Sequence, residues 1–274
     1  MSTPDISQPP QKRDLEAHFR QKYESNGPAG PSPSRRKAYG YTTPADHYEI
    51  SVKKLVNQHT KWLDVGAGKS PFPDNPKLAE ELSKKAMRFF GIDPSENVKQ
   101  NPYVQQHYCG KLEDYRSDER FDLITLRMVA EHVEDPVQLA RELSDRILPG
   151  GIVVMLTVWK FAPVTVLANL LPFAWHHPVK KLFWGGDEAD TFPTVYRMNT
   201  KRTLKKLFSD FGFNQSHVFL LGDCSVTSQL GNFNHVELFT WRACKSIGVS
   251  YPESCILGIF RKDCPAAIGE STRG

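Results

Sequence analysis

Short apolar runs alternate along this chain with segments of helical periodicity, and this alternation restricts the fold more than any other feature of the sequence. Strands that alternate with helices favour a parallel sheet covered by helices on both faces. Such a sheet binds ligands at the carboxyl ends of its strands, where the strand order reverses. The expected strands are 62–65, 88–92, 104–108, 121–126, 152–158, 217–221 and 256–261, and the expected helices are 47–58, 77–85, 136–147, 200–211 and 236–246.

The net charge of the chain is concentrated in its first 37 residues. Lys and Arg together number 35 and Asp and Glu number 31, which gives a net charge of +4. Residues 1–37 contain seven basic and four acidic side chains, so the remainder carries only +1. A nearly neutral body lacks the basic field that is typical of nucleic-acid enzymes, and we therefore expect no nucleic-acid partner.

The N-terminal region has a composition different from that of the rest of the chain. Residues 1–10 are polar and rich in proline, 13–24 could form one short helix, and 26–34 have the composition of a linker. We therefore expect a flexible N-terminal tail over 1–37 and a single folded domain over 38–274.

The sequence contains no segment that we expect to act as a secretory signal or to span a membrane. The longest apolar stretch, 151–175, is interrupted by Lys160, Pro163 and Pro172, and neither part reaches the ~20 apolar residues of a membrane span. The five cysteines lack the paired spacing of a metal or redox motif. We expect free thiols, no bound metal and a cytoplasmic protein, whereas the oligomeric state is not predicted.

One connection, 159–199, is far longer than the others and is rich in aromatic residues. Long connections in compact domains are usually functional lids or disordered segments, and this one is too aromatic for disorder. We expect it to form a cap over the strand ends and to contact the substrate, although ordinary core packing is an equally valid reading of its aromatic side chains. The predicted substrate-binding residues are Trp159, His176, His177, Trp184 and Tyr196, together with Tyr41 from the segment that precedes the sheet.

The stretch WLDVGAGKS at 62–70 predicts a strand that runs into a glycine turn. Gly66 and Gly68 allow the backbone to turn tightly and to approach a ligand without an intervening Cβ. A helix beginning after the turn would offer free amides to an anion, although an ordinary strand-to-helix turn has the same pattern. A phosphate-binding P-loop is excluded, because that motif needs a glycine where Leu63 stands.

A second candidate binding residue, Asp93, ends the apolar run 88–92, 27 residues after Gly66. An acid at the end of the second strand can accept hydrogen bonds from both hydroxyls of a ribose. Asp93 can also cap the following segment, and the two roles are compatible. Asn101-Pro102-Tyr103 is similar to a signature of amino-group methylation in nucleic acids, but it precedes the third strand instead of following the fourth.

The order of these motifs resembles the class I S-adenosylmethionine-dependent methyltransferases, particularly their small-molecule group. The resemblance rests on Phe121-Asp122, Glu131-His132, Asp135-Pro136 and the LPGG at 148–151, and it covers 46–160 well. It implies a Rossmann-like, doubly wound and mostly parallel seven-stranded sheet with a last antiparallel strand. It also implies S-adenosylmethionine as cofactor and S-adenosylhomocysteine as product.

The resemblance assigns cofactor contacts along the first four strands. The glycine loop would hold the methionine part, Asp93 the ribose, and the segments after the second and third strands the adenine, while the end of the fourth strand faces methionine and substrate. The residues implied in this way are Asp64, Gly66, Ala67, Gly68, Asp93, Pro94, Leu112, Glu113, Arg127 and Met128.

Two positions depart from the family pattern, and one histidine is a candidate base. Ser70 replaces the third glycine of the loop, and Arg127 stands where the family usually has a small or polar residue. Arg127 could pair with the cofactor carboxylate, with an acidic substrate or, one turn later, with Glu131. His132 could deprotonate the acceptor, or it could pack or act as a cap beneath the aromatic segment.

The predicted function is S-adenosylmethionine-dependent methyl transfer to a small, partly apolar metabolite. One alternative keeps the fold and pocket without methyl transfer, as a cyclase-like or inactive partner protein. A nicotinamide-dependent oxidoreductase is disfavoured, because Pro71 stands where its glycine motif needs glycine. A non-enzymatic interaction module that uses the basic tail and the cap is the remaining alternative.

Overall fold

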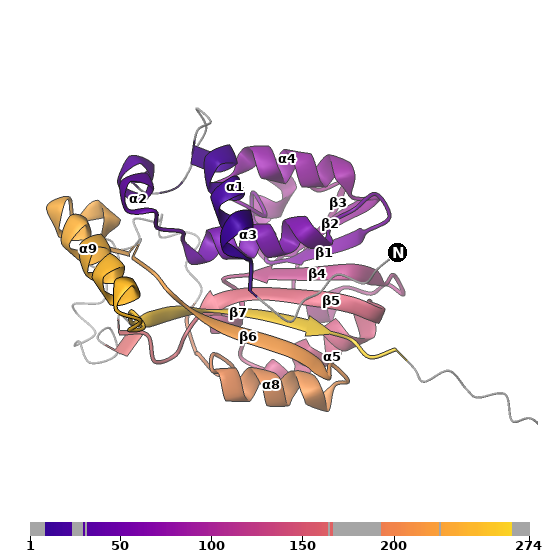
Figure 1. Cartoon of the computed structure of the whole chain (residues 1–274). Coiled ribbons are helices and arrows are strands. Elements are labelled where there is room, and N and C mark those ends of the chain that lie inside the picture. Colours follow the sequence, from indigo (N-terminus) through magenta and orange to yellow (C-terminus); the bar gives the residue numbers. More distant parts are fainter. Residues whose placement is uncertain are drawn as a thin grey trace, which may run out of the picture.

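Seven strands form one sheet at the centre of the molecule (Figure 1). The computed structural model describes residues 9–23, 30, 32–163, 165–166, 193–224 and 226–264. The strand order is β3-β2-β1-β4-β5-β7-β6; the first five strands pair in parallel, and β7 is antiparallel to both β5 and β6. This confirms the predicted α/β fold and its antiparallel last strand. The strands are β1 (Lys61–Val65), β2 (Arg88–Asp93), β3 (Gln106–Cys109), β4 (Phe121–Arg127), β5 (Ile147–Val158), β6 (Gln215–Gly222) and β7 (Glu253–Arg261).

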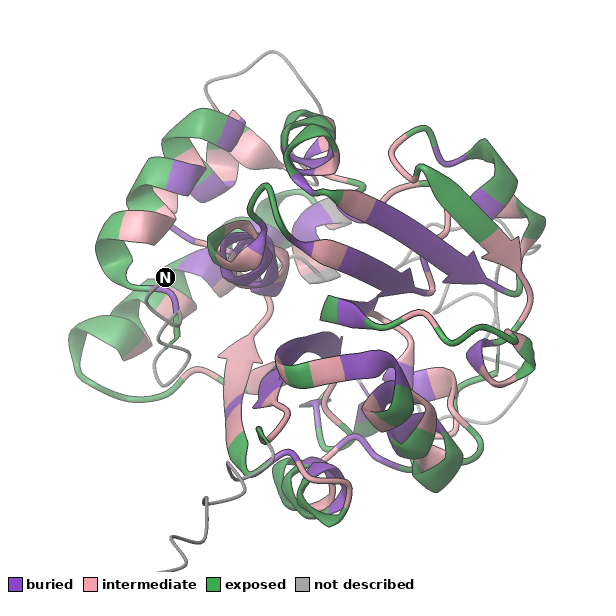
Figure 2. Cartoon of the chain, turned by 90° about the vertical axis from the view of Figure 1, so that its right-hand side faces the viewer, coloured by how far each residue is buried: buried purple, intermediate pink, exposed green. Residues whose placement is uncertain are grey.

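Helices cover both faces of the sheet, and the sheet separates two apolar cores (Figure 2, where buried positions are purple). One core contains side chains of α5 and α8, and the other contains side chains of α3 and α4. The described helices are α1 (Lys12–Tyr23), α2 (Pro33–Tyr39), α3 (Pro44–Leu55), α4 (Pro76–Lys85), α5 (Pro136–Arg146), α8 (Lys201–Asp210) and α9 (Asn232–Ser246), with short 3-10 turns η1 (Glu96–Gln100), η2 (Leu112–Asp114), η3 (Ala130–His132) and η5 (Val226–Gln229).

The continuous apolar run of β5 follows from its position inside the sheet. Successive side chains of a strand point to opposite faces, so a strand buried on both faces has no polar alternation. Val153 and Met155 accordingly lie in one core, and Val154 and Leu156 lie in the other.

The LPGG segment differs from its predicted role. We expected it to end a helix and to precede the fifth strand, but β5 begins at Ile147 and includes the whole segment. The pairing with β4 shifts between Phe121 and Leu123, and Gly150 has φ +78°. The segment therefore forms the irregular first part of the strand. From sequence, its proline and glycines indicate only where the preceding helix ends, not that the strand has already begun.

The described part of the N-terminal region packs against the body, whereas we expected a flexible tail over 1–37. Helix α1 lies along α3 (Figure 1), and the side chains of His18 and Lys22 are buried there. Arg36 on α2 is also buried. From composition we expected such charged residues to be solvated, whereas here His18 and Lys22 contact Asp46 and Glu49, and the Arg36 guanidinium lies 4.9 Å from the ring centroid of Tyr23.

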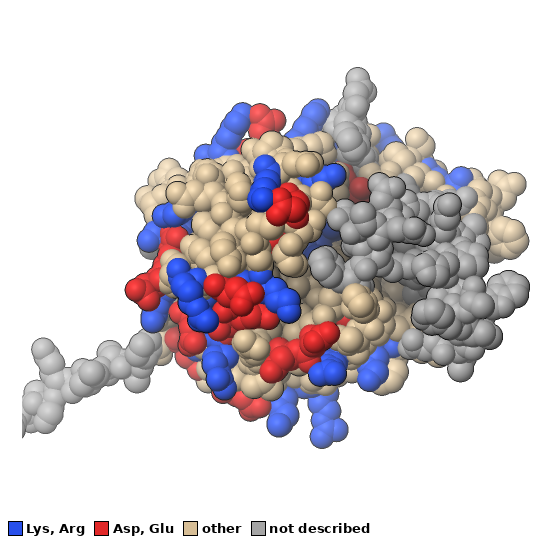
Figure 3. All heavy atoms as spheres, turned by 180° about the vertical axis from the view of Figure 1, so that it is seen from behind, with Lys and Arg blue, Asp and Glu red and all other residues tan. Residues whose placement is uncertain are grey.

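Charges on the face opposite to that of Figure 1 are mixed in sign, with Lys and Arg lying among Asp and Glu (Figure 3). In the part of the chain that the structure describes, no helix is both long and apolar enough to cross a membrane.

Candidate active site

Three adjacent strands bring their carboxyl ends together at one edge of the sheet. β1 lies between β2 and β4, with Val65 opposite Ile92 on one side and Leu126 on the other. The strand order reverses between β1 and β4, which is the place where open α/β sheets bind ligands. Gly66, Asp93 and Arg127 follow or end these strands, so the structure places them at a common edge.

The glycine loop turns directly after β1 and is held against the end of β2. The backbone N–H groups of Gly66 and Ala67 both donate to the carbonyl oxygen of Ile92, at 2.7 and 3.1 Å. Gly66 has φ +76°, and a Cβ there would lie 2.3 Å from Cγ2 of Val129. Backbone conformation and crowding therefore both require glycine at this position.

The carboxylate of Asp93 is built into the same loop. The Gly68 N–H donates to Oδ2 of Asp93 at 2.8 Å, and the Ser95 N–H donates to Oδ1 at 2.7 Å. The carboxylate is buried, yet each of its oxygens has acceptor capacity beyond one N–H donor. The cap of the following turn η1 is Ser95, whose side chain accepts the Asn97 N–H, so Asp93 is not the cap itself but holds the backbone of that residue. Its role toward a ligand stays a prediction.

The side chain of Asn101 holds the backbone of the glycine loop, a role that we did not predict from the sequence. Its side-chain Nδ2 donates to the carbonyl oxygens of Ala67, at 3.1 Å, and Gly68, at 3.3 Å. The only sequence signal was the Asn-Pro-Tyr motif at 101–103, which we had considered only as a catalytic signature of another class.

The expected helix N-terminus is not part of this loop. α4 begins only at Pro76, and the side chain of Asn75 accepts the Leu78 N–H as its cap. The intervening proline-rich segment packs inward through the buried Phe72. The loop therefore offers its own backbone, and not the amides of α4, to a ligand.

The segment after β3 follows the same edge. The Gly110 N–H donates to the carbonyl oxygen of Asp93 at 2.9 Å, which ties this segment to the end of β2. Leu112 is buried in the core, Glu113 is half-buried, and Pro94 is exposed. The guanidinium of Arg146 donates to the carbonyl oxygens of Leu112 and Ser117 and thereby holds η2 in place.

Asp64 lies inside the sheet beneath the loop. Thr125 donates its hydroxyl to Oδ1 of Asp64 at 2.6 Å, and Nε1 of Trp62 donates to the same hydroxyl oxygen at 2.7 Å. Burial raises the pKa of Asp64 to about 7, although the Thr125 hydrogen bond and the charge of Arg127 oppose this rise.

Arg127 and Met128 end β4 in an unusual conformation. Met128 has φ +55°, which few residues other than glycine adopt, and its N–H donates to Leu156 O at 2.7 Å. The Arg127 side chain is half-buried and makes no hydrogen bond or ion pair within the described part of the chain. Glu131, which we considered as its partner, instead accepts a hydrogen bond from the Thr157 hydroxyl at 2.6 Å.

The buried Glu131 also anchors the returning end of the long connection. Its backbone oxygen accepts the N–H groups of Val195, at 2.7 Å, and Tyr196, at 3.2 Å. Burial raises the pKa of the Glu131 carboxyl, against the effect of the Thr157 hydrogen bond. This anchoring brings Tyr196, at φ +49°, to the end of β4.

His132 adjoins the same segment. Its Nδ1 lies 3.0 Å from the carbonyl oxygen of Pro193. A carbonyl oxygen only accepts hydrogen bonds, so Nδ1 carries a proton, and the basic lone pair of the neutral ring is on Nε2.

The other predicted substrate residues differ in their surroundings. Trp159 is partly buried against the core and forms an edge-to-face contact with Phe161. Tyr41 is fully buried, donates to Gly222 O at 3.1 Å and accepts the Cys224 N–H at 2.8 Å. We therefore assign Tyr41 to the support of the segment after β6 and leave it out of the proposed substrate site. His176, His177 and Trp184 lie outside the described residues.

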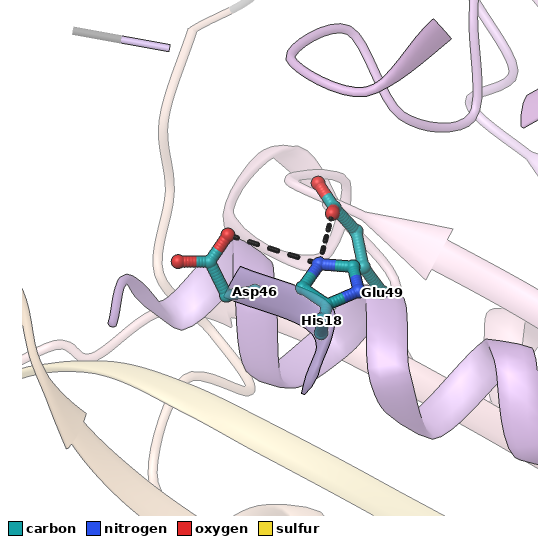
Figure 4. Close-up of side chains that lie close together, drawn as sticks. All are labelled: His18, Asp46 and Glu49. Atoms are coloured by element: carbon teal, nitrogen blue, oxygen red, sulfur yellow. Dashed lines mark hydrogen bonds and ion pairs between the residues drawn. The ribbon is translucent and has the colours of Figure 1, made fainter. Parts of the chain in front are cut away.

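A second polar cluster, between α1 and α3, has the residue types of a metal site. His18, Asp46 and Glu49 lie within 4.8 Å of one another, and Nε2 of His18 is 2.8 Å from Oε2 of Glu49 (Figure 4). The Lys22 ammonium donates to Asp46 and to Glu49, at 2.8 Å each. Burial lowers the pKa of Lys22, but the two adjacent carboxylates more than offset this and raise it. A lysine cation thus already balances the acids, and we interpret the cluster as a structural contact.

Comparison with known proteins agrees with this fold. A family model described as "Methyltransferase domain" matches residues 19–218, and the chain belongs to this family. A "Ubiquinone biosynthesis O-methyltransferase" of Coxiella burnetii (strain Dugway 5J108-111) is 31% identical over 145 residues, which are 44% of this chain and 59% of that protein. The protein of the same name from strain RSA 331 is 35% identical over 98 residues, 32% of this chain and 39% of that protein.

The alignments therefore span less than two thirds of the length of these relatives. Among solved structures, that of a putative sarcosine dimethylglycine methyltransferase from Galdieria sulphuraria has a TM-score of 0.51 and 14% identity. The match covers 91% of this chain and 98% of that one, and at this identity it shows the fold alone.

Proposed function

We propose that the protein is an S-adenosylmethionine-dependent methyltransferase that acts on a small, partly apolar molecule in the cytoplasm. The observation that carries this proposal is the hydrogen bond between the Gly68 N–H and the Asp93 carboxylate. It joins the two places assigned to the methionine part and the ribose part of one ligand. Membership of the methyltransferase-domain family supports the same reaction.

The residues at this edge fit an adenosyl ligand. A Cβ at Gly68 would meet no atom of the described residues within 4 Å, so this part of the chain leaves the space beside the loop open. In the proposed site, Asp93 accepts the ribose hydroxyls and the glycine loop holds the methionine part. The remaining assignments are Asp64, Gly66, Ala67 and Gly68 for methionine, and Pro94, Leu112 and Glu113 for adenine.

When bound, S-adenosylmethionine supplies a methyl group that its sulfonium has already activated. The chain then has to hold the acceptor atom ~3–3.5 Å from that methyl group and in line with it, because correct positioning of the reacting atoms accelerates the transfer. We assign His132 as the base, because its Nε2 can take the proton that an acceptor hydroxyl or ammonium must lose. The Pro193 carbonyl fixes the required tautomer.

The acceptor is proposed to bind between the end of β4 and the described ends of the long connection. Trp159 and Tyr196 supply apolar surface there, and His176, His177 and Trp184 remain candidate contacts from the same connection. Arg127 and Met128 face the junction of cofactor and acceptor, where Arg127 would bind a carboxylate of either molecule. A hydroxyl acceptor is the first class to test, because the curated relatives are named O-methyltransferases.

Two measurements test this function. Calorimetric titration with S-adenosylhomocysteine should show one site per chain, whereas NADH should not bind. Incubation with methyl-labelled S-adenosylmethionine and a panel of small hydroxyl, amine and thiol compounds should then transfer label to one class. Binding without transfer across a broad panel would favour a pocket that is used without methylation, and absence of binding would contradict the proposal.

A further inference from the structure

Helix α9 has an apolar surface that the rest of the described chain does not cover. Five large apolar side chains between residues 233 and 249 are 53–74% exposed. The opposite side of the helix is buried through Asn234 and Leu238. We call the exposed set the α9 face; it consists of Phe233, Val236 and Phe239 of the helix, and of Ile247 and Val249 directly after its end. A concentrated exposed apolar surface of this kind marks an interaction site.

The topology places this helix at the edge of the sheet that carries the proposed active site. α9 connects the end of β6 to the start of β7, where Gly222 pairs with Glu253. In the neighbouring pair, Val158 at the carboxyl end of β5 lies opposite Cys255. The connection therefore leaves and re-enters the sheet at the carboxyl ends of the parallel strands, and α9 projects there at the end of the molecule (Figure 1).

The exposed charged side chains of α9 are all basic. Arg242 and Lys245 are exposed, and Lys245 lies 4.7 Å from the ring centroid of Trp241. The only acid in the helix, Glu237, is half-buried and accepts hydrogen bonds from Thr227 and Tyr251. Arg242, three residues after Phe239, therefore flanks the exposed apolar side chains, whereas Lys245, two turns after the buried Leu238, projects from the other side of the helix. No acid of α9 is exposed.

We propose that the α9 face binds the surface of an anionic lipid bilayer. A helix that lies in a membrane interface buries an apolar face while its basic groups meet anionic headgroups, and α9 carries both elements. Docking through α9 brings the carboxyl edge of the sheet to the lipid, where a partly apolar acceptor is concentrated. The lipid contact itself does not depend on methyl transfer.

A second copy of the chain fits this surface less well. A symmetric dimer buries the same patch of both subunits in one contact, so it would bring the basic groups of both copies together with no exposed acid of α9 to pair with them. Like charges at a contact are unfavourable, whereas anionic headgroups neutralise them. The charge on α9 thus favours a lipid surface over self-association.

The test is co-sedimentation of the full chain with vesicles of phosphatidylcholine alone and of phosphatidylcholine with one quarter phosphatidylglycerol. We expect binding to the anionic vesicles, weaker binding to the neutral ones, and a decrease with added salt. The double variant F233S/F239S should bind anionic vesicles at least tenfold more weakly. The control M87S/V137S removes two apolar side chains of similar exposure, 51% and 50%, elsewhere on the surface and should bind like the natural chain.

Three outcomes overturn the proposal. The natural chain does not bind anionic vesicles, or both double variants lose binding equally, or sedimentation velocity shows a dimer that only F233S/F239S dissociates. Circular dichroism and S-adenosylhomocysteine titration of both variants establish that each is folded, since none of the four positions lies in the proposed cofactor site.

Discussion

The backbone N–H of Gly68 lies 2.8 Å from Oδ2 of Asp93, so the loop after β1 and the acid that ends β2 form one unit. The other carboxylate oxygen of Asp93 accepts the Ser95 N–H. The acid that we assign to the ribose therefore also sets the conformation of the loop that we assign to the methionine part. Changes at Asp93 should affect ligand binding through both routes.

Replacing Asp93 by alanine should weaken S-adenosylhomocysteine binding by ~1–3 kcal/mol, about 5- to 150-fold, because the ligand hydroxyls lose a charged acceptor. Calorimetric titration measures the change. Asp122→Ala is the matched control. Asp122 also accepts a backbone N–H, that of Lys61 at 2.9 Å, but it lies at the amino ends of the strands, away from the proposed site. Unchanged affinity in Asp93→Ala would remove Asp93 from the site.

The two loop glycines should respond differently to alanine. Gly66→Ala meets both a positive φ and the side chain of Val129, so it should lower the free energy of unfolding by more than the ~1–2 kcal/mol of the left-handed conformation alone. Gly68→Ala has open space and φ +44°, so it should be tolerated better while weakening S-adenosylhomocysteine binding. Urea denaturation and titration of both variants check this order, and equal loss of stability in the two would contradict it.

The contact between α1 and α3 should depend on Lys22. Lys22→Met leaves two buried carboxylates without their cation and should cost about 3–5 kcal/mol in urea denaturation. Lys12→Met, which removes only an exposed lysine 3.8 Å from Glu16, should cost less than about 0.5 kcal/mol. Similar stabilities of the two variants would show that the α1 contact contributes little.

His47 should make the folded state less stable in mild acid. Burial lowers the pKa of His47 from 6.5 to about 4, so between these values the unfolded chain binds a proton that the folded chain does not. Relative to His47→Asn, the natural chain should lose about 2 kcal/mol of stability between pH 7 and pH 5. The exposed His59→Asn serves as control. A constant difference between the natural chain and His47→Asn across this range would contradict the burial effect.

The inner strands of the sheet were predictable from the sequence, because they are buried on both faces and therefore consist of apolar runs. The glycine loop and Asp93 were predictable for a related reason, since they directly follow such runs. The roles of Lys22 and Asn101 were not predictable, because they depend on partners distant in the sequence. Lys22 pairs with Asp46 and Glu49. Asn101 donates to carbonyl oxygens of the glycine loop. The burial of Tyr41 was not predictable either, because an aromatic side chain carries no sequence signal that separates a buried support from a substrate contact.

A crystal structure with bound S-adenosylhomocysteine tests the central claim most directly. The account predicts ribose hydroxyls within hydrogen-bonding distance of the Asp93 carboxylate and the homocysteine part against Gly66–Gly68. Density for the ligand at another place, or a loop that closes the space beside Gly68 with the protein's own side chains, would contradict it.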